Sequence, residues 1–214
     1  MIKINRIVKY LILADIAFWT GWGLVTPVFA IFVVDRIQGG TALTVGIATA
    51  IYWVLRSLLV FPIGVMLDDY KGERDDYLFL VAGSFIASLV PFGFIFAHYA
   101  WHIYVLQFFY GLGLAMSLAG WRSIFTRNID STRAATEWSL DDASLSMGTG
   151  LAGLVSGILV TKLGYDASFA IAGSLGLLSV VFLLVLRKEI SGVFNRRFHK
   201  NVREIFDIEN KVKR

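Results

Sequence analysis

Long apolar stretches alternate with short charged segments along the chain. Six stretches are long and apolar enough to form membrane-spanning helices: residues 10–34, 43–67, 78–97, 103–120, 136–160 and 169–186. A helix needs about 20 apolar residues to cross the hydrocarbon core of a bilayer. Lipid offers no partners to backbone polar groups, so a spanning segment must close its own hydrogen bonds as a helix. The pattern therefore predicts an all-α polytopic membrane protein with six transmembrane helices in residues 1–188.

Residues 189–214 follow a different pattern from the rest of the chain. Apolar residues such as Phe194, Phe198 and Val202 fall on one side of a helical wheel, and basic residues such as Arg196 and Lys200 fall on the other. This segment is predicted to be a basic amphipathic cytoplasmic tail that lies on the anionic membrane surface. A solvated basic tail is the alternative interpretation.

The overall composition agrees with a membrane protein. Hydrophobic residues make up 57% of the chain and charged residues 17%, with a mean hydropathy of +0.67. A soluble domain carries roughly 25% charged residues. The chain has no cysteine, which excludes disulfides and thiolate metal sites.

The positions of lysine and arginine predict the orientation. If the N-terminus is cytoplasmic, 17 of the 20 basic residues lie in cytoplasmic segments, and only Arg36 and Lys162 lie in outer loops. This asymmetry is typical of an integral protein of the plasma membrane with both termini cytoplasmic. The high isoelectric point therefore reflects orientation in the lipid bilayer, and no nucleic acid is expected as a partner.

Polar residues inside the spans are the functional candidates, because burying them in lipid is costly. Asp15, Arg56 and Gln107 lie in the first, second and fourth spans, whereas the third and sixth carry no charge. Trp22 lies on the first span near Asp15, and Tyr52 lies one turn before Arg56. We expect these five residues to contact a solute. The alternatives are aromatic packing for Trp22, and for Asp15 a place at the cytoplasmic entrance or a proton-carrying role.

Arg56 has three possible roles. It lies near the bilayer middle, roughly 16 Å from the cytoplasmic end of its span at 1.5 Å per residue. It can contact an anion or carboxylate in a central cavity, form a structural ion pair with Asp15, or face lipid. The offset of Asp15 toward the cytoplasmic end makes the direct pair strained.

The segment between the second and third spans contains a motif of small, acidic and basic residues. Gly64, Asp68 and Gly72 form its frame, with Asp69, Lys71 and Arg74 among them. This segment resembles the loop signature G-x-x-x-D-(R/K)-x-G-(R/K) of the major facilitator superfamily, with one extra residue and with Asp69 at a position that is usually basic. The resemblance implies a gating loop built from Gly64, Asp68, Asp69, Lys71, Gly72 and Arg74.

A second copy of the motif follows about 90 residues later. Gly157 and Gly164 have the spacing of the signature, with Thr161 in place of the acid, and Ala-Gly-Ser follows each copy. Three-helix repeats of inverted topology are what this superfamily is built from. The resemblance therefore implies two inverted three-helix repeats, which together make one six-helix half similar to the N-terminal half.

The fifth span carries the remaining residues of the resemblance. Gly153 and Gly157 form a G-x-x-x-G step for close helix packing. Glu137, Asp141 and Asp142 occupy its first turns, where the helix dipole favours acids, so capping alone is an alternative to a contact role. In the fourth span Gln107 occupies a position where the family often has arginine, which puts the usual proton antiport in doubt.

The resemblance implies a secondary transporter that moves a small solute by alternating access. Because the chain has half the usual number of helices, it implies a homodimer or a second six-helix half. A non-transporting membrane scaffold or assembly subunit is the alternative function. The glycine and serine spacing of intramembrane proteases does not occur, so no enzymatic activity is expected. The proline repeats of mitochondrial-type carriers do not occur either. No cofactor is expected. His98 and His102 alone offer too few ligands for a metal.

Overall fold

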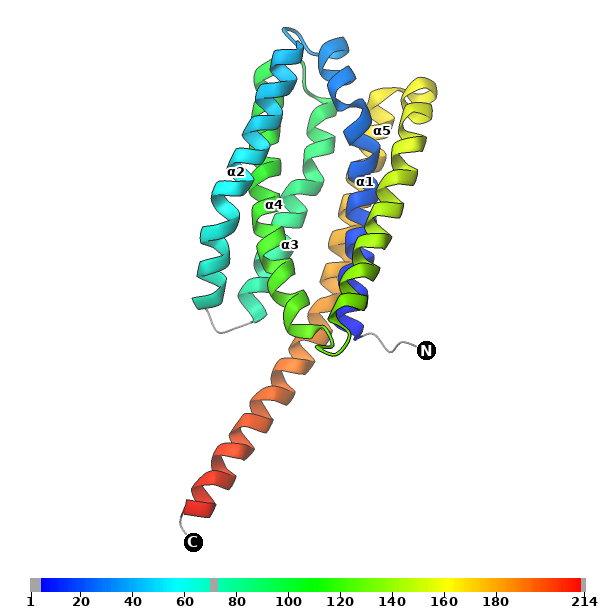
Figure 1. The fold of residues 1–214 in the computed structure, drawn as a ribbon. Coiled ribbons are helices and arrows are strands. Elements are labelled where there is room, and N and C mark those ends of the chain that lie inside the picture. The colour runs from blue at the N-terminus through cyan, green and yellow to red at the C-terminus, as the bar shows by residue number, and fades with distance from the viewer. Residues whose placement is uncertain (1–4, 70–72, 213–214) are drawn as a thin grey trace.

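The computed structural model describes residues 5–69 and 73–212, with side chains up to Arg187. Within these residues the chain forms five helices: α1 (Arg6–Arg36), α2 (Ala42–Asp69), α3 (Glu73–Ile95), α4 (Ala100–Asn128) and α5 (Ala134–Val212). They stand side by side as a bundle (Figure 1). All five are long and apolar enough to cross a membrane.

The longest helix, α5, is interrupted at Gly164. This residue has φ 82° and ψ 173°, which is not helical. Figure 1 shows the chain reversing its direction there, so α5 has a first arm, 134–163, and a second arm, 165–212. The two predicted spans 136–160 and 169–186 both fall within α5, one in each arm. The described residues thus form five helices rather than six separate ones, because a single glycine makes the turn without a loop. The count of six spans and the inverted repeats stay predictions.

The second arm continues beyond the bundle. Its backbone stays helical to Val212 and projects past the ends of the other helices (Figure 1). The predicted tail 189–214 belongs largely to this projection. Its side chains lie outside the described part, so the amphipathic surface helix stays a prediction.

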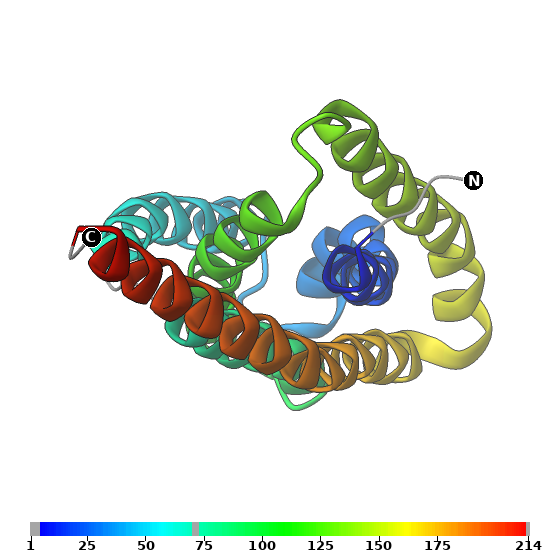
Figure 2. The same ribbon diagram turned by 90° about the horizontal axis from the view of Figure 1, so that it is seen from below.

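Helix α1 lies at the centre of the core, between the two arms of α5 (Figure 2). Two glycines allow this approach. A Cβ atom on Gly21 would lie 2.6 Å from the carbonyl oxygen of Ala172 in the second arm. A Cβ atom on Gly23 would lie 2.7 Å from the carbonyl oxygen of Thr149 in the first arm. Small residues let helix backbones come close where no hydrophobic effect drives helices together.

Helix α2 is the least covered helix. Only Thr44, Ala48 and Leu67 are buried along it, and its packing is mostly against α4. Large apolar side chains such as Leu58 and Phe61 are exposed, by 67% and 75%. The first arm of α5 is similar, with Met147 exposed by 70% and Leu154 by 72%. One face of the bundle is therefore bounded by two poorly covered helical segments.

Polar contacts close both ends of the bundle. At one end, the backbone N–H of Gln38 donates to the carbonyl of His98 at 2.8 Å. At the other end, the amide of Asn5 donates to the carbonyl of Asn128 at 3.1 Å. The start of α1 and the end of α4 therefore share one end of the bundle, where Asp76 and Arg127 also form an ion pair.

Candidate solute site

Stacked aromatic rings connect three helices in the middle of the bundle. Trp22 of α1 stacks on Tyr110 of α4, with ring centroids 3.7 Å apart and planes 23° apart. Tyr110 in turn stacks on Tyr52 of α2 at 4.6 Å and 21°. The ring of Trp53 follows at 4.9 Å from Tyr52. We call these four residues the aromatic column.

Arg56 lies at the α2 end of the aromatic column. Its guanidinium carbon lies 5.0 Å from the centroid of the Trp53 ring, within the range of a cation–π contact. The hydroxyl of Tyr52 lies close enough to Arg56 and Tyr110 to interact with both. Among the described residues no carboxylate forms an ion pair with Arg56. The guanidinium of Arg56 thus contacts neutral aromatic and hydroxyl groups, so its positive charge remains available to attract an anion.

The local sequence explains how the column forms. A Cβ atom on Gly111 would lie 2.9 Å from the backbone oxygen of Tyr52, so glycine lets α2 approach α4 closely at this height. Tyr110, next to Gly111, then reaches the Tyr52 ring. Gln107 lies one turn before Tyr110, is buried, and its Oε1 atom has no hydrogen-bond partner within the described residues. A solute that donates a hydrogen bond would satisfy this atom.

A second group of polar residues lines a cavity of about 270 Å³ between α1, α3, α4 and α5. We call it the acidic cavity. Its charged lining residues are Asp15, Arg122, Asp141 and Asp142, and its aromatic lining residues are Phe18, Trp19, Trp121 and Trp138. Asp15 belongs to this cavity and makes no ion pair with Arg56 in the described structure.

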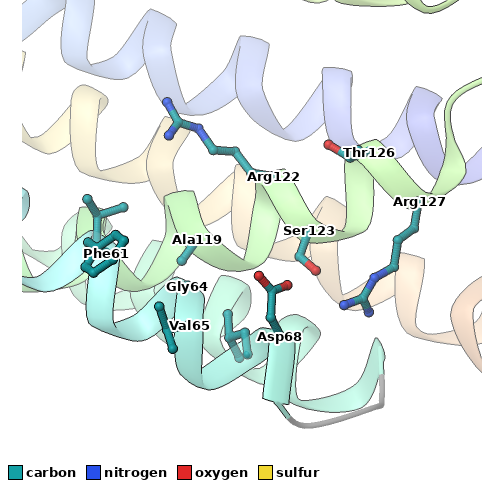
Figure 3. A pocket seen from close by; sticks show the side chains of 11 residues that line it. Phe61, Gly64, Val65, Asp68, Ala119, Arg122, Ser123, Thr126 and Arg127 are labelled. Carbon is teal, nitrogen blue, oxygen red and sulfur yellow. The ribbon is translucent and has the colours of Figure 1, made fainter.

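A third space lies between the C-terminal ends of α2 and α4. It has a volume of about 530 Å³ and is lined by Gly64, Asp68, Ser123 and Arg127, among others. Figure 3 shows Asp68 and Ser123 facing each other across it, while the side chain of Arg122 extends away from Asp68. Gly64 has open space where a side chain would lie.

The other residues of the predicted gating loop lie around this space or outside the described part. Asp69 and Arg74 are exposed at the facing ends of α2 and α3. Lys71 and Gly72 lie outside the described residues.

The acids and glycines predicted as contacts of the fifth span have different surroundings. Glu137 is 1% exposed, and its carboxylate accepts a hydrogen bond from the backbone N–H of Asp130 at 3.3 Å. This hydrogen bond therefore stabilises the loop before α5. Gly153 has α1 atoms at ordinary contact distance, whereas Gly157 has open space beside it.

The two histidines near the start of α4 have local roles. The Nδ1 atom of His102 accepts the backbone N–H of Tyr99 at 3.1 Å, and the His98 ring contacts the carbonyl of Phe96 at 2.8 Å. The described residues contain no group of three or more His, Cys, Asp or Glu side chains placed to hold a metal ion.

Comparison with known proteins identifies the family. The sequence profile of the Major Facilitator Superfamily matches residues 11–209. The chain belongs to this superfamily. The match covers nearly all of the described helices, including both arms of α5.

Two individual proteins that are similar to this superfamily chain are longer than it. An uncharacterized MFS-type transporter of Methanocaldococcus jannaschii is 24% identical over 180 residues, which are 84% of this chain and 45% of the relative. The crystal structure of the POT family transporter PepTSo has the same fold over 87% of this chain and 38% of its own, with a TM-score of 0.68 and 18% identity. The superfamily chain thus spans less than half the length of both proteins.

The structure of this superfamily chain brings the predicted solute residues into two places. Trp22, Tyr52 and Arg56 meet at the aromatic column with Gln107 one turn away, while Asp15 lies in the acidic cavity. Sequence reasoning missed Tyr110, which joins the column, and Arg122 and Trp138, which line the cavity. A usable signal for Tyr110 was its position three residues after Gln107, on the same face of α4.

Proposed function

We propose that the chain is a half-sized secondary transporter that moves a small solute across the plasma membrane by alternating access. The observation that carries this proposal is the match to the Major Facilitator Superfamily over residues 11–209. The polar interior of the bundle supports it. Within the described residues, Arg56 has no carboxylate partner, and the Oε1 atom of the buried Gln107 has no hydrogen-bond partner.

In this proposal the aromatic column and Arg56 form one wall of the solute path. Arg56 lies at the poorly covered edge of the bundle and is half-buried, so a solute can reach it from the open face. A charged group inside a membrane costs at least about 2.5 kcal/mol at the helix centre, which favours its retention for binding. The opposite wall comes from a second copy of the chain or from a second six-helix half.

Transport can be tested without knowing the coupling ion. The chain is reconstituted in vesicles, a panel of amines, carboxylates, sugars and amino acids is screened by thermal shift, and each stabilising solute is tested by counterflow. We expect counterflow of at least one bound solute, and its loss in Arg56→Ala with the protein still inserted and monodisperse. Binding without counterflow for every solute contradicts the proposal and favours the scaffold function.

The ion-pair role of Arg56 is tested by a second variant. If Arg56→Ala misfolds and Arg56→Ala with Asp15→Ala folds again, the two residues form a structural pair. We expect no such rescue, because the structure places Asp15 in the acidic cavity and Arg56 beside Trp53. A double-mutant cycle on the unfolding temperature measures the coupling directly.

A further inference from the structure

Two buried polar atoms in the acidic cavity lack a hydrogen-bond partner within the described residues, and one is an acceptor while the other is a donor. The Oδ1 atom of Asp141 is an acceptor without a donor, and the Nε1 atom of Trp121 is a donor without an acceptor, within the described residues. Asp141 is 5% exposed and Trp121 is 7% exposed. Both line the same cavity. Buried polar groups are costly to leave without partners, so a molecule that supplies both partners is favoured there.

The charges of the cavity favour a cation. Asp15 on α1 lies close enough to Asp141 for their charges to interact, and Asp142 adds a third carboxyl group from α5. Arg122 on α4 is the one basic residue among those that line the cavity, and its side chain is exposed. Three carboxyl groups and one guanidinium group line this partly enclosed space, so a positive group that pairs with the acids is favoured there.

The remaining lining residues select for an aromatic or apolar body. Trp138 lies in T-shaped contact with Trp121, with centroids 5.6 Å apart, and Trp19 lines the cavity from α1. Indole faces stabilise a nearby ammonium group through cation–π attraction and pack against flat rings. The hydroxyls of Ser84 and Ser117 already bond each other at 2.8 Å, so they do not replace the missing partners.

We propose that the acidic cavity binds a small aromatic amine that also carries a hydrogen-bond acceptor. The ammonium group donates to Asp141 and is attracted by Asp15, the ring lies among the tryptophans, and the acceptor receives the Trp121 N–H. The volume of about 270 Å³ lies at or below the lower end of drug-sized pockets, which fits a one-ring molecule. This inference deepens the proposed transport function and rests on it, because it names the class of solute.

The test uses three one-ring compounds that differ by a single group. Tritiated tyramine is bound to the whole chain in lipid nanodiscs, and unlabelled tyramine, phenethylamine and para-ethylphenol compete with it. Phenethylamine lacks the hydroxyl, and para-ethylphenol lacks the ammonium group. We expect para-ethylphenol to compete about tenfold or more weakly than tyramine, and phenethylamine to compete severalfold more weakly. No binding of tyramine, or equal competition by para-ethylphenol, overturns the proposal.

Variants locate the site independently of the ligand series. Asp141→Asn should weaken tyramine binding about tenfold or more, whereas Asp166→Asn, an exposed acid two residues after the turn at Gly164, should leave it unchanged. If Asp141→Asn does not remain monodisperse, Trp138→Leu serves instead, because Trp138 is 38% exposed. Full affinity in these cavity variants overturns the assignment.

Binding at equilibrium separates this inference from the transport proposal. Tyramine binding that depends on Asp141, without counterflow, contradicts transport and leaves the site in place. Counterflow of another solute, without tyramine binding, contradicts the site and leaves transport in place.

Discussion

Arg127, in the last turn of α4, donates a 2.6 Å hydrogen bond to the fully buried carboxylate of Asp76, in the first turn of α3. The two residues tie helices that the chain joins only through the opposite end of the bundle. The Arg127 side chain is 32% exposed, and that of Asp76 is 0% exposed. The burial of this ion pair is therefore intermediate between that of an exposed pair and that of a fully buried pair.

Removing one partner should leave a buried carboxylate without its counter-charge. Arg127→Ala is expected to destabilise the fold by about 1 to 3 kcal/mol, between the values for exposed and buried pairs. Adding Asp76→Asn should restore much of this loss, because no charge then remains buried. The unfolding temperature in detergent, followed by fluorescence-detected size exclusion, measures both effects. Arg74→Ala, which removes an exposed arginine of α3, is the matched control. Equal losses in Arg127→Ala and Arg74→Ala would contradict this role.

The turn inside α5 depends on the backbone of one glycine. Gly164 has φ 82° and ψ 173°, a conformation that is essentially restricted to glycine. Nothing lies within 4 Å of the place where its Cβ would stand. Gly164→Ala should therefore destabilise the chain by about 1 to 3 kcal/mol through backbone strain alone.

Gly157 provides the control for this prediction. It also has open space beside it, but it lies in the helical first arm. Gly157→Ala should be neutral or stabilise by up to about 1 kcal/mol, because alanine favours helix. Thermal unfolding of the two variants separates strain from crowding. A similar response of both would show that the turn does not need glycine.

The hydrophobic pattern predicts the helices well but not their ends. Each predicted span lies within or overlaps a helix of the structure, because long apolar stretches of the sequence mark the segments that avoid water. The helices extend beyond the runs to charged residues such as Arg6 and Asp69, because helical hydrogen bonding continues outside the apolar layer. The interruption of α5 at Gly164 also follows from the backbone geometry of this residue, which hydropathy does not register.

The candidate site could be predicted only as a set of residues. Burial cost in lipid selects Arg56, Gln107 and Asp15 from the sequence. Their grouping depends on the spacing of α1, α2 and α4, which is set by contacts such as Gly111 against Tyr52. Pairwise distances of this kind are absent from a single sequence, so Tyr110 and the separation of Asp15 from Arg56 emerge only in three dimensions.

The orientation in the membrane can be tested in this cysteine-free chain. Tyr99 is 48% exposed before α4, and Ser131 is exposed in the loop between α4 and α5, at the opposite end. From the distribution of lysine and arginine we expect the Ser131 end to lie in the cytoplasm. Tyr99→Cys should react with an impermeant maleimide added to intact cells, and Ser131→Cys should react only after the cells are opened. The reverse pattern would contradict cytoplasmic termini.

The poorly covered face of the bundle predicts how the chain assembles. Leu58 of α2 and Met147 of the first arm of α5 are exposed by 67% and 70%. The polar residues Ser57 and Ser146 are exposed beside them. Polar groups on a lipid-facing surface are unfavourable, so a second bundle should cover this face. We expect a parallel homodimer in which α2 of one copy faces the first arm of α5 of the other.

Cysteine pairs test this arrangement against random collision. Chains with Leu58→Cys are mixed with chains with Met147→Cys, at positions of similar depth from the cytoplasmic end, and oxidised in membranes. They should form a disulfide-linked dimer, whereas Phe85→Cys on α3 with Leu178→Cys on the second arm should not, although both side chains are exposed.

A second test concerns the basic loop residues. If they hold the dimer together, raised salt should weaken it, and so should Arg74→Glu with Lys71→Glu, although Lys71 lies outside the described residues. A monomer in native mass spectrometry that still exchanges solute in vesicles would contradict the homodimer, because one bundle would then complete the solute path alone.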